Sequence, residues 1–147
     1  MWDESARAAF TELLPPDHDF PPVEPERWYA LIEDGTVSML LAEENGEIVG
    51  SSACGESRDE DAGPATGEIR SFFVAAGHWR RGIGRAMMAA VLDSLRRRGC
   101  AEATVWSLAA NERANAFYEA HGFRRDGAEK REDVWAGLLE QRFRRSL

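Results

Sequence analysis

Residues 67–98 read GEIRSFFVAAGHWRRGIGRAMMAAVLDSLRRR, and the spacing of the apolar residues changes within this stretch. The first eight residues, 67–74, have the composition of a strand. After a turn, apolar residues recur at helical spacing from Gly82 to Arg98, and Gly99 marks the end of this helix. The apolar face of the helix consists of Ile83, Met87, Ala90, Val91 and Leu95. The stretch is therefore predicted to form a strand, a turn and a helix.

The segments on either side of this unit predict further strands. Asn45-Gly46 separates two strand-like runs, Thr36–Glu43 and Glu47–Ala53, as in a β-hairpin. A strand over Ala101–Leu108, a short helix over Asn111–His121 and one or two strands within Val134–Phe143 follow. A strand–helix–strand crossover joins parallel neighbours, whereas a hairpin joins antiparallel ones. We therefore expect an α/β (α+β) fold with a mixed, mostly antiparallel sheet flanked by helices.

The N-terminal part of the chain is helical and rich in proline. Helices are predicted over Asp3–Leu14 and Glu26–Glu33. The segment between them holds five of the six prolines, which excludes a regular element there. No strand-like run precedes the first helix.

The composition excludes several classes of protein. At 147 residues, with 44% hydrophobic and 30% charged residues, the chain has the length and make-up of one globular domain. No apolar run approaches the roughly 18 residues of a transmembrane span, and the acidic start is unlike a signal peptide, so a cytoplasmic location is expected. Cys54 and Cys100 form neither a disulfide framework nor a metal-binding motif, and no metal site is expected.

The charge of the chain is unevenly distributed. The net charge is −8, yet the window from His78 to Gly99 holds six arginines and a single acid. An acidic chain is a poor candidate for binding nucleic acid, whereas a local basic patch favours an anionic ligand. Arg96, Arg97 and Arg98 are explained by a solvated helix end, where cations suit the helix dipole.

The turn that leads into the long helix is a candidate anion site. Gly82 and Gly84 remove side chains from the first helical turn, whose amides have no partner within the helix. Together with the helix dipole these amides would hold a diphosphate, and Arg80, Arg81 and Arg85 flank them. The alternative is that the glycines only permit close packing.

Two segments together resemble a known family. RRGIGRA at residues 80–86 and NERANAFYEAHGF at residues 111–123 are similar to the two motifs of the GNAT superfamily of acetyl-CoA-dependent N-acetyltransferases. The first motif of that family is usually Q/R-x-x-G-x-G/A, and Trp79 replaces its opening Gln or Arg. The second motif matches closely. The resemblance extends from about Leu40 to Gly127.

The resemblance implies an acetyl-CoA site built largely from backbone. Gly82, Gly84 and the amides from Arg81 to Ala86 would cradle the pyrophosphate, and Asn111 would hydrogen-bond the cofactor arm. The strand before the turn would contain a bulge that splays it from its parallel neighbour, and its free edge would pair with pantetheine. The Phe72 amide would support the developing oxyanion. The expected cofactor-binding residues are Phe72, Phe73, Val74, Trp79, Arg80, Arg81, Gly82, Ile83, Gly84, Arg85, Ala86, Asn111 and Phe117.

Two residues are expected to carry the chemistry. Tyr118 resembles the general acid that protonates the departing CoA thiolate in this family, the alternative being a core aromatic. Glu68 matches the position of the general base in the histone acetyltransferase branch. A base is needed because an alkylammonium, with a pKa of about 10, must lose a proton before it attacks. The alternative for Glu68 is a structural hydrogen bond. His121 is predicted to lie at the surface or to cap its helix.

The leading hypothesis is an acyltransferase that moves an acetyl group from acetyl-CoA to a primary amine of a small molecule or peptide, by direct attack in a ternary complex. The alternative is a non-catalytic sensor or regulatory domain that binds acyl-CoA. Residues 1–147 are expected to be one N-acetyltransferase domain, with acceptor-side helices in 1–35, the cofactor-binding and catalytic core in 36–127 and C-terminal strands in 128–147. Because the strand with which the family usually begins is not predicted, the sheet edge would be uncovered, which favours a homodimer. No membrane partner is expected.

Overall fold

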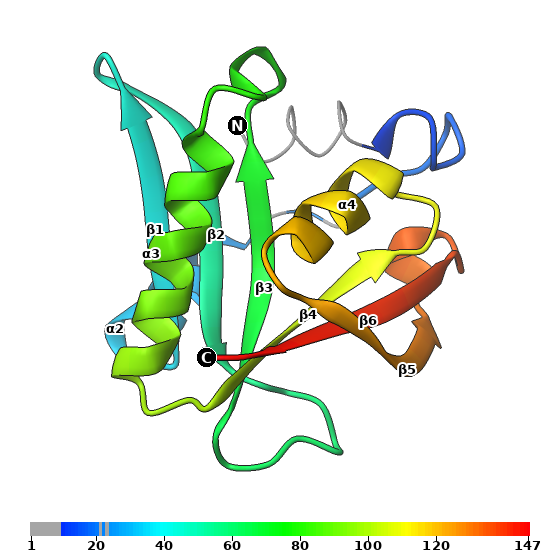
Figure 1. Cartoon of the computed structure of the whole chain (residues 1–147). Coiled ribbons are helices and arrows are strands. Elements are labelled where there is room, and N and C mark those ends of the chain that lie inside the picture. Colours follow the sequence, from blue (N-terminus) through cyan, green and yellow to red (C-terminus); the bar gives the residue numbers. More distant parts are fainter. Residues whose placement is uncertain (1–9, 21, 23) are drawn as a thin grey trace.

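A six-stranded sheet forms the centre of the computed structural model, which describes residues 10–20, 22 and 24–147 (Figure 1). The strands are β1 (Val37–Glu44), β2 (Glu47–Glu56), β3 (Thr66–Val74), β4 (Glu102–Leu108), β5 (Arg124–Arg131) and β6 (Leu139–Ser146). Their order in the sheet is β1-β2-β3-β4-β6-β5. β3 and β4 run parallel, and the other neighbouring strands run antiparallel. The predicted mixed, mostly antiparallel sheet is confirmed.

Two helices cover the same face of the sheet. α3 (Ile83–Arg97) packs along β1, β2 and β3, and α4 (Glu112–Ala120) lies beside it on that face (Figure 1). The core that they share joins residues of both helices to the sheet, among them Val91, Leu95, Tyr118 and Phe143. The predicted apolar face of α3 is correct except at Ala90, which is exposed.

The hairpin between β1 and β2 is confirmed. Asn45 and Gly46 both adopt positive φ, 52° and 81°, which is the conformation that a two-residue hairpin turn requires. The strands pair up to Glu44 and Glu47 on either side of the turn.

β3 contains a bulge that separates it from β4. Two consecutive β2 residues, Ala53 and Cys54, pair with Ser71 and Ile69, which leaves Arg70 as an extra residue in β3. The pairing of β3 with β4 ends next to this bulge, at Ile69. Beyond it the two parallel strands diverge, as the family resemblance implied.

The C-terminal region differs from the sequence prediction. Its strands are Arg124–Arg131 and Leu139–Ser146, and Asp133–Trp135 forms a 3-10 turn between them. β5 has the sequence RRDGAEKR, whose side chains are mostly exposed at the sheet edge. A strand of this kind shows no apolar alternation, so the sequence pattern does not reveal it.

The N-terminal helix prediction lies largely outside the described residues, as does any strand before it. Of the predicted segment Asp3–Leu14, residues 11–13 form a turn. The second predicted helix is confirmed as α2 (Pro25–Glu33), which has proline at its first position and no buried residue.

In the described part of the chain, every helix is too short or too polar to span a bilayer.

Candidate active site

A cleft of about 650 Å³ opens where β3 and β4 diverge. Its walls include the ends of both strands, the turn before α3, the start of α3 and one side of α4. Tyr118 lines it and packs on Phe143, which lies on the helix-covered face of β6. Glu140 also lines it, and because side chains alternate along a strand, Glu140 belongs to the opposite face of β6. The cleft therefore reaches both faces of the sheet.

The turn into α3 presents backbone amides to this cleft. Positive φ at Arg80 (59°) and Gly82 (84°) redirects the chain into the helix, for which Gly82 is the N-cap. Ala86 donates to the Gly82 carbonyl over 3.0 Å, which is the first bond of the helical ladder. The amides of residues 83–85 precede that bond and have no acceptor within the helix. They are therefore available to an anion at the positive end of α3.

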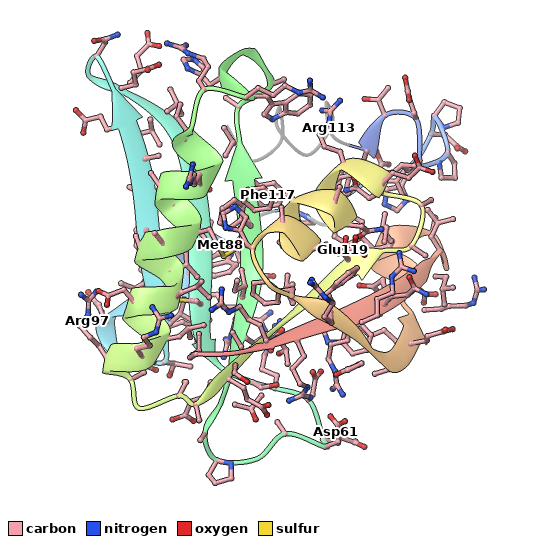
Figure 2. The ribbon with its side chains drawn as sticks, viewed as in Figure 1. Asp61, Met88, Arg97, Arg113, Phe117 and Glu119 are labelled. Atoms are coloured by element: carbon pink, nitrogen blue, oxygen red, sulfur yellow. The ribbon has the colours of Figure 1, made fainter. Side chains whose placement is uncertain are left out.

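Gly84 allows α4 to approach this turn closely. A Cβ added at Gly84 would lie 3.3 Å from the ring of Phe117. Phe117 packs in turn against Phe72 of β3, with ring centroids 5.3 Å apart, and Figure 2 shows it on the side of α4 that faces β3 and α3. The two helices are thus held on either side of the cleft by contacts that a larger residue at 84 would disturb.

The arginines of the turn divide into two groups. Arg81 donates to Glu44 over 3.1 Å, and His78 Nδ1 lies 2.9 Å from the other Glu44 oxygen, so Arg81 ties the turn to the β1–β2 hairpin. Arg80 and Arg85 line the cleft, and within the described residues neither side chain forms a hydrogen bond or an ion pair. Their charges are therefore free to meet an anion beside the amides.

Three expected cofactor-binding residues lie outside the lining of the cleft, namely Arg81, Ile83 and Ala86. The Ala86 amide is also occupied by the Gly82 carbonyl, which corrects the expectation that it joins the phosphate cradle. The other expected residues line the cleft: Phe72, Phe73, Val74, Trp79, Arg80, Gly82, Gly84, Arg85, Asn111 and Phe117.

Trp79 has a structural role where the family resemblance places Gln or Arg. Its indole Nε1 donates to the Val74 carbonyl over 2.8 Å, which ties the turn to the end of β3. The guanidinium of Arg113 stacks 3.9 Å above the indole, a cation–π contact. Figure 2 shows Arg113 at the end of α4 that lies next to this turn. The pair connects α4 to the turn at the entrance of the cleft.

Two asparagines fix the start of α4. Asn111 is its N-cap, and the side-chain oxygen accepts from the Ala114 amide over 3.2 Å, which leaves the side-chain amide group for a ligand. Asn115 is buried, accepts from Ser107 over 2.7 Å and donates to the carbonyls of Leu108 and Ala109. Sequence reasoning missed Asn115, although an asparagine inside an apolar helical segment is a signal for such anchoring.

Tyr118 is a buried residue in the lining of the cleft. Its side chain is buried against Phe117, Phe123 and Phe143. Burial raises the pKa of the Tyr118 hydroxyl, so the group stays protonated and able to donate. Tyr118 is therefore both a core aromatic, which was the alternative prediction, and a cleft residue, as the proposed role of general acid requires.

His121 also lines the cleft, one turn of α4 further on. Its ring packs on Phe117 with centroids 4.5 Å apart. Burial, together with the charges of Arg85 and Arg145, lowers the pKa of His121, so the ring is neutral at physiological pH. The residue is the C-cap of α4 as predicted, but it faces the cleft rather than open solvent.

The structure does not bring Glu68 into the cleft. Glu68 is not among the described residues that line the cleft. Its buried carboxylate accepts three hydrogen bonds from Arg58, one from the backbone amide and two from the guanidinium. This is the structural bond that the sequence left open as the alternative.

Glu140 is a cleft carboxylate that sequence reasoning missed. Its side chain is only 4% exposed, and Oε2 has no hydrogen-bond partner among the described residues. Burial raises the pKa of Glu140 to about 7, with Lys130 opposing and Glu132 reinforcing the shift. No local motif marks this residue, because its place depends on the register of β6 with β4 and β5.

The sequence profile of the acetyltransferase (GNAT) family matches residues 2–123 of the chain. The chain belongs to the GNAT family of acetyltransferases. Acetyl transfer, with acetyl-CoA as donor, is the general activity of this GNAT protein. No curated relative matches the sequence.

Solved structures of other acetyltransferases share the fold of this GNAT protein. A ribosomal-protein-alanine N-acetyltransferase from Brucella melitensis superimposes with a TM-score of 0.77 at 22% identity, covering 99% of this chain and 91% of that one. A putative acetyltransferase from Salmonella typhimurium, solved with acetyl-CoA, gives 0.76 at 20% identity and covers 99% and 85%. The NatC complex bound to a Gag peptide and CoA contains a chain that gives 0.69 at 18% identity, covering 98% and 92%.

Proposed function

We propose that this GNAT protein is an N-acetyltransferase that moves the acetyl group of acetyl-CoA to a primary amine of a small molecule or peptide. The observation that carries the proposal is the cleft between β3 and β4, which joins an amide-lined helix N-terminus on one face of the sheet to a buried carboxylate on the other. Donor and acceptor can therefore meet inside the sheet from opposite faces, as direct attack in a ternary complex requires.

The donor side fits acetyl-CoA. The amides of residues 83–85 and the unpaired guanidinium groups of Arg80 and Arg85 suit a pyrophosphate. The side-chain amide of Asn111 and the diverged end of β3 suit the amide groups of the pantetheine arm. When bound, acetyl-CoA supplies an activated thioester carbonyl.

Tyr118 is the proton donor in this proposal. In the net reaction a C–N bond replaces the C–S bond of the thioester, the ammonium nitrogen gives up two protons, and the sulfur takes up one. The Tyr118 hydroxyl, kept protonated by burial, gives its proton to the leaving sulfur. The second proton released by the nitrogen restores the hydroxyl, and the first leaves to solvent.

The acceptor side is lined by aromatic rings. Phe10 and Trp135 pack with centroids 4.9 Å apart, and Trp106 lines the cleft from β4. Rings beside a buried carboxylate suit an ammonium group, which is stabilised by both. The fold is shared with a chain of a complex solved with a peptide, which supports peptides as one class of acceptor.

The proposal is tested by following thiol release from acetyl-CoA with a panel of polyamines, amino-acid amides and peptides with free amino termini. We expect turnover with at least one amine and binding of acetyl-CoA in the micromolar range by isothermal titration. Binding without turnover on any amine would instead indicate the non-catalytic sensor. Absence of binding would overturn the proposal.

A further inference from the structure

We propose that Glu140 is the general base, the group that takes the first proton from the acceptor ammonium. This inference rests on the N-acetyltransferase function proposed above. It is carried by the position of the Glu140 carboxylate in the cleft, its burial and its unpartnered oxygen.

The register of β6 fixes where this carboxylate lies. Glu140 pairs with Leu108 at the end of β4 on one side and with Lys130 of β5 on the other. The end of β4 is one wall of the opening between the diverged strands. Glu140 therefore lies beside the opening, on the face from which the acceptor would enter.

A buried carboxylate oxygen without a donor is costly, and native structures rarely keep one without a reason. Oε2 of Glu140 is such an oxygen among the described residues. An ammonium entering the cleft would supply the missing donor. The same oxygen could then accept a proton directly from that nitrogen.

The charged groups around Glu140 form a short path to the surface. Lys130 stacks over Trp106 at 4.4 Å and pairs with Glu132 at 2.8 Å. The negative charge of Glu132 raises the pKa of Glu140, and the charge of Arg58 lowers the pKa of Glu132 in turn. The Glu132 side chain is 47% exposed, so it can pass a proton from Glu140 to water. From α4, the titratable groups in the same cleft are Tyr118 and His121, the C-cap of the helix.

The ionised Glu140 carboxylate takes one proton from the ammonium, which leaves a neutral amine and a carboxylic acid. The amine lone pair then attacks the thioester carbonyl carbon. Glu140 returns its proton to water by way of Glu132 before the next turnover. This role requires the ionised form, so activity should rise with pH through the pKa of Glu140, about 7.

Glu140→Gln is the decisive variant, because the amide fills the same space but cannot accept the proton. We expect kcat/KM for the amine at pH 7.5 to fall about 100-fold or more, while the affinity for acetyl-CoA stays within about twofold. Glu129→Gln, which alters an exposed carboxylate on the neighbouring strand β5, is the matched control and should keep wild-type activity.

The position of the acidic limb of the pH–rate profile separates a catalytic role from a structural one. Glu132→Gln removes a charge that raises the pKa of Glu140, so the limb should move to lower pH. Lys130→Met removes a charge that lowers the pKa of Glu140, so the acidic limb should move to higher pH. A merely structural Glu140 would leave the limb unmoved in both variants.

The outcomes separate this inference from the proposed function. Turnover by the wild-type protein, with Glu140→Gln equally active and the acidic limb unchanged, would overturn the role of Glu140 and leave the function standing. Binding of acetyl-CoA by the wild-type protein without turnover on any amine would overturn both. Loss of turnover in Glu140→Gln with the fold and acetyl-CoA affinity retained supports the inference.

Discussion

At the scale of single residues, Tyr118 is the group whose role the sequence and the structure support together. Its hydroxyl is held in a cleft that also contains the backbone amides of α3, and its ring is part of the core. Tyr118→Phe keeps the ring and removes the hydroxyl group, and with it the proton to be donated. We expect kcat to fall by about 10²-fold or more, with acetyl-CoA affinity and melting temperature close to wild type. Unchanged kcat, measured by thiol release, would contradict the assignment.

Glu68 provides a second test at this scale. Glu68→Gln breaks a buried carboxylate's bidentate bond to Arg58, whose own side chain is 61% exposed. We expect a loss of about 1–2 kcal/mol in the free energy of unfolding, measured in urea, with only a small change in kcat. If kcat fell as far as in Glu140→Gln while stability stayed constant, Glu68 rather than Glu140 would be the base.

Glu140 also makes stability depend on pH. Its pKa is raised from 4.5 to about 7 in the folded protein, so the folded state holds the proton more tightly than the unfolded state. The stabilisation is complete below pH 4.5 and is lost as pH rises through 7. Between pH 5 and pH 9 the wild-type protein should therefore lose about 2 kcal/mol relative to Glu140→Gln. Parallel pH dependences of the two melting temperatures would contradict the raised pKa.

A comparison of Tyr118 and Gly82 with Glu140 shows how far sequence reasoning reaches at this scale. Tyr118 and Gly82 belong to local motifs, so their positions follow from a few neighbouring residues. Glu140 enters the cleft only through its pairing with Leu108 and Lys130, which are remote in sequence. A carboxylate placed by strand register leaves no local signal.

At the scale of elements, the turn into α3 is the part whose geometry matters most. Gly82 adopts φ 84°, and a Cβ there would meet nothing within 4 Å, so the cost of Gly82→Ala is backbone strain of roughly 1–2 kcal/mol. We expect acetyl-CoA affinity, measured by isothermal titration, to fall several-fold as the amides are displaced. Gly77→Ala is the control, since its Cβ is equally free and its φ is not positive. Equal affinities in the two variants would argue against the amide cradle.

The elements also show which kinds of sequence signal can be trusted. The β1–β2 hairpin was predictable because Asn45-Gly46 specifies its own turn. The pattern of residues 67–74 does not predict the bulge at Arg70, which is implied only by the family resemblance. β5 was missed because an exposed edge strand lacks apolar alternation.

At the scale of the whole molecule, the sheet would separate the two substrates of the proposed reaction. Helices α3 and α4 cover the face that carries the proposed phosphate site, and Glu140 lies on the opposite face. The bulge at Arg70 connects the two faces by ending the pairing of β3 with β4. The arrangement suits the direct transfer proposed above, because the acetyl group would need to cross only the gap between these strands.

A crystal structure of the protein with bound CoA would test the proposed cofactor site most directly. We expect pyrophosphate oxygens on the amides of residues 83–85, with the thiol arm running between β3 and β4 towards Tyr118. A cleft that stays empty at saturating CoA, or a cofactor whose phosphates lie away from the start of α3, would contradict it.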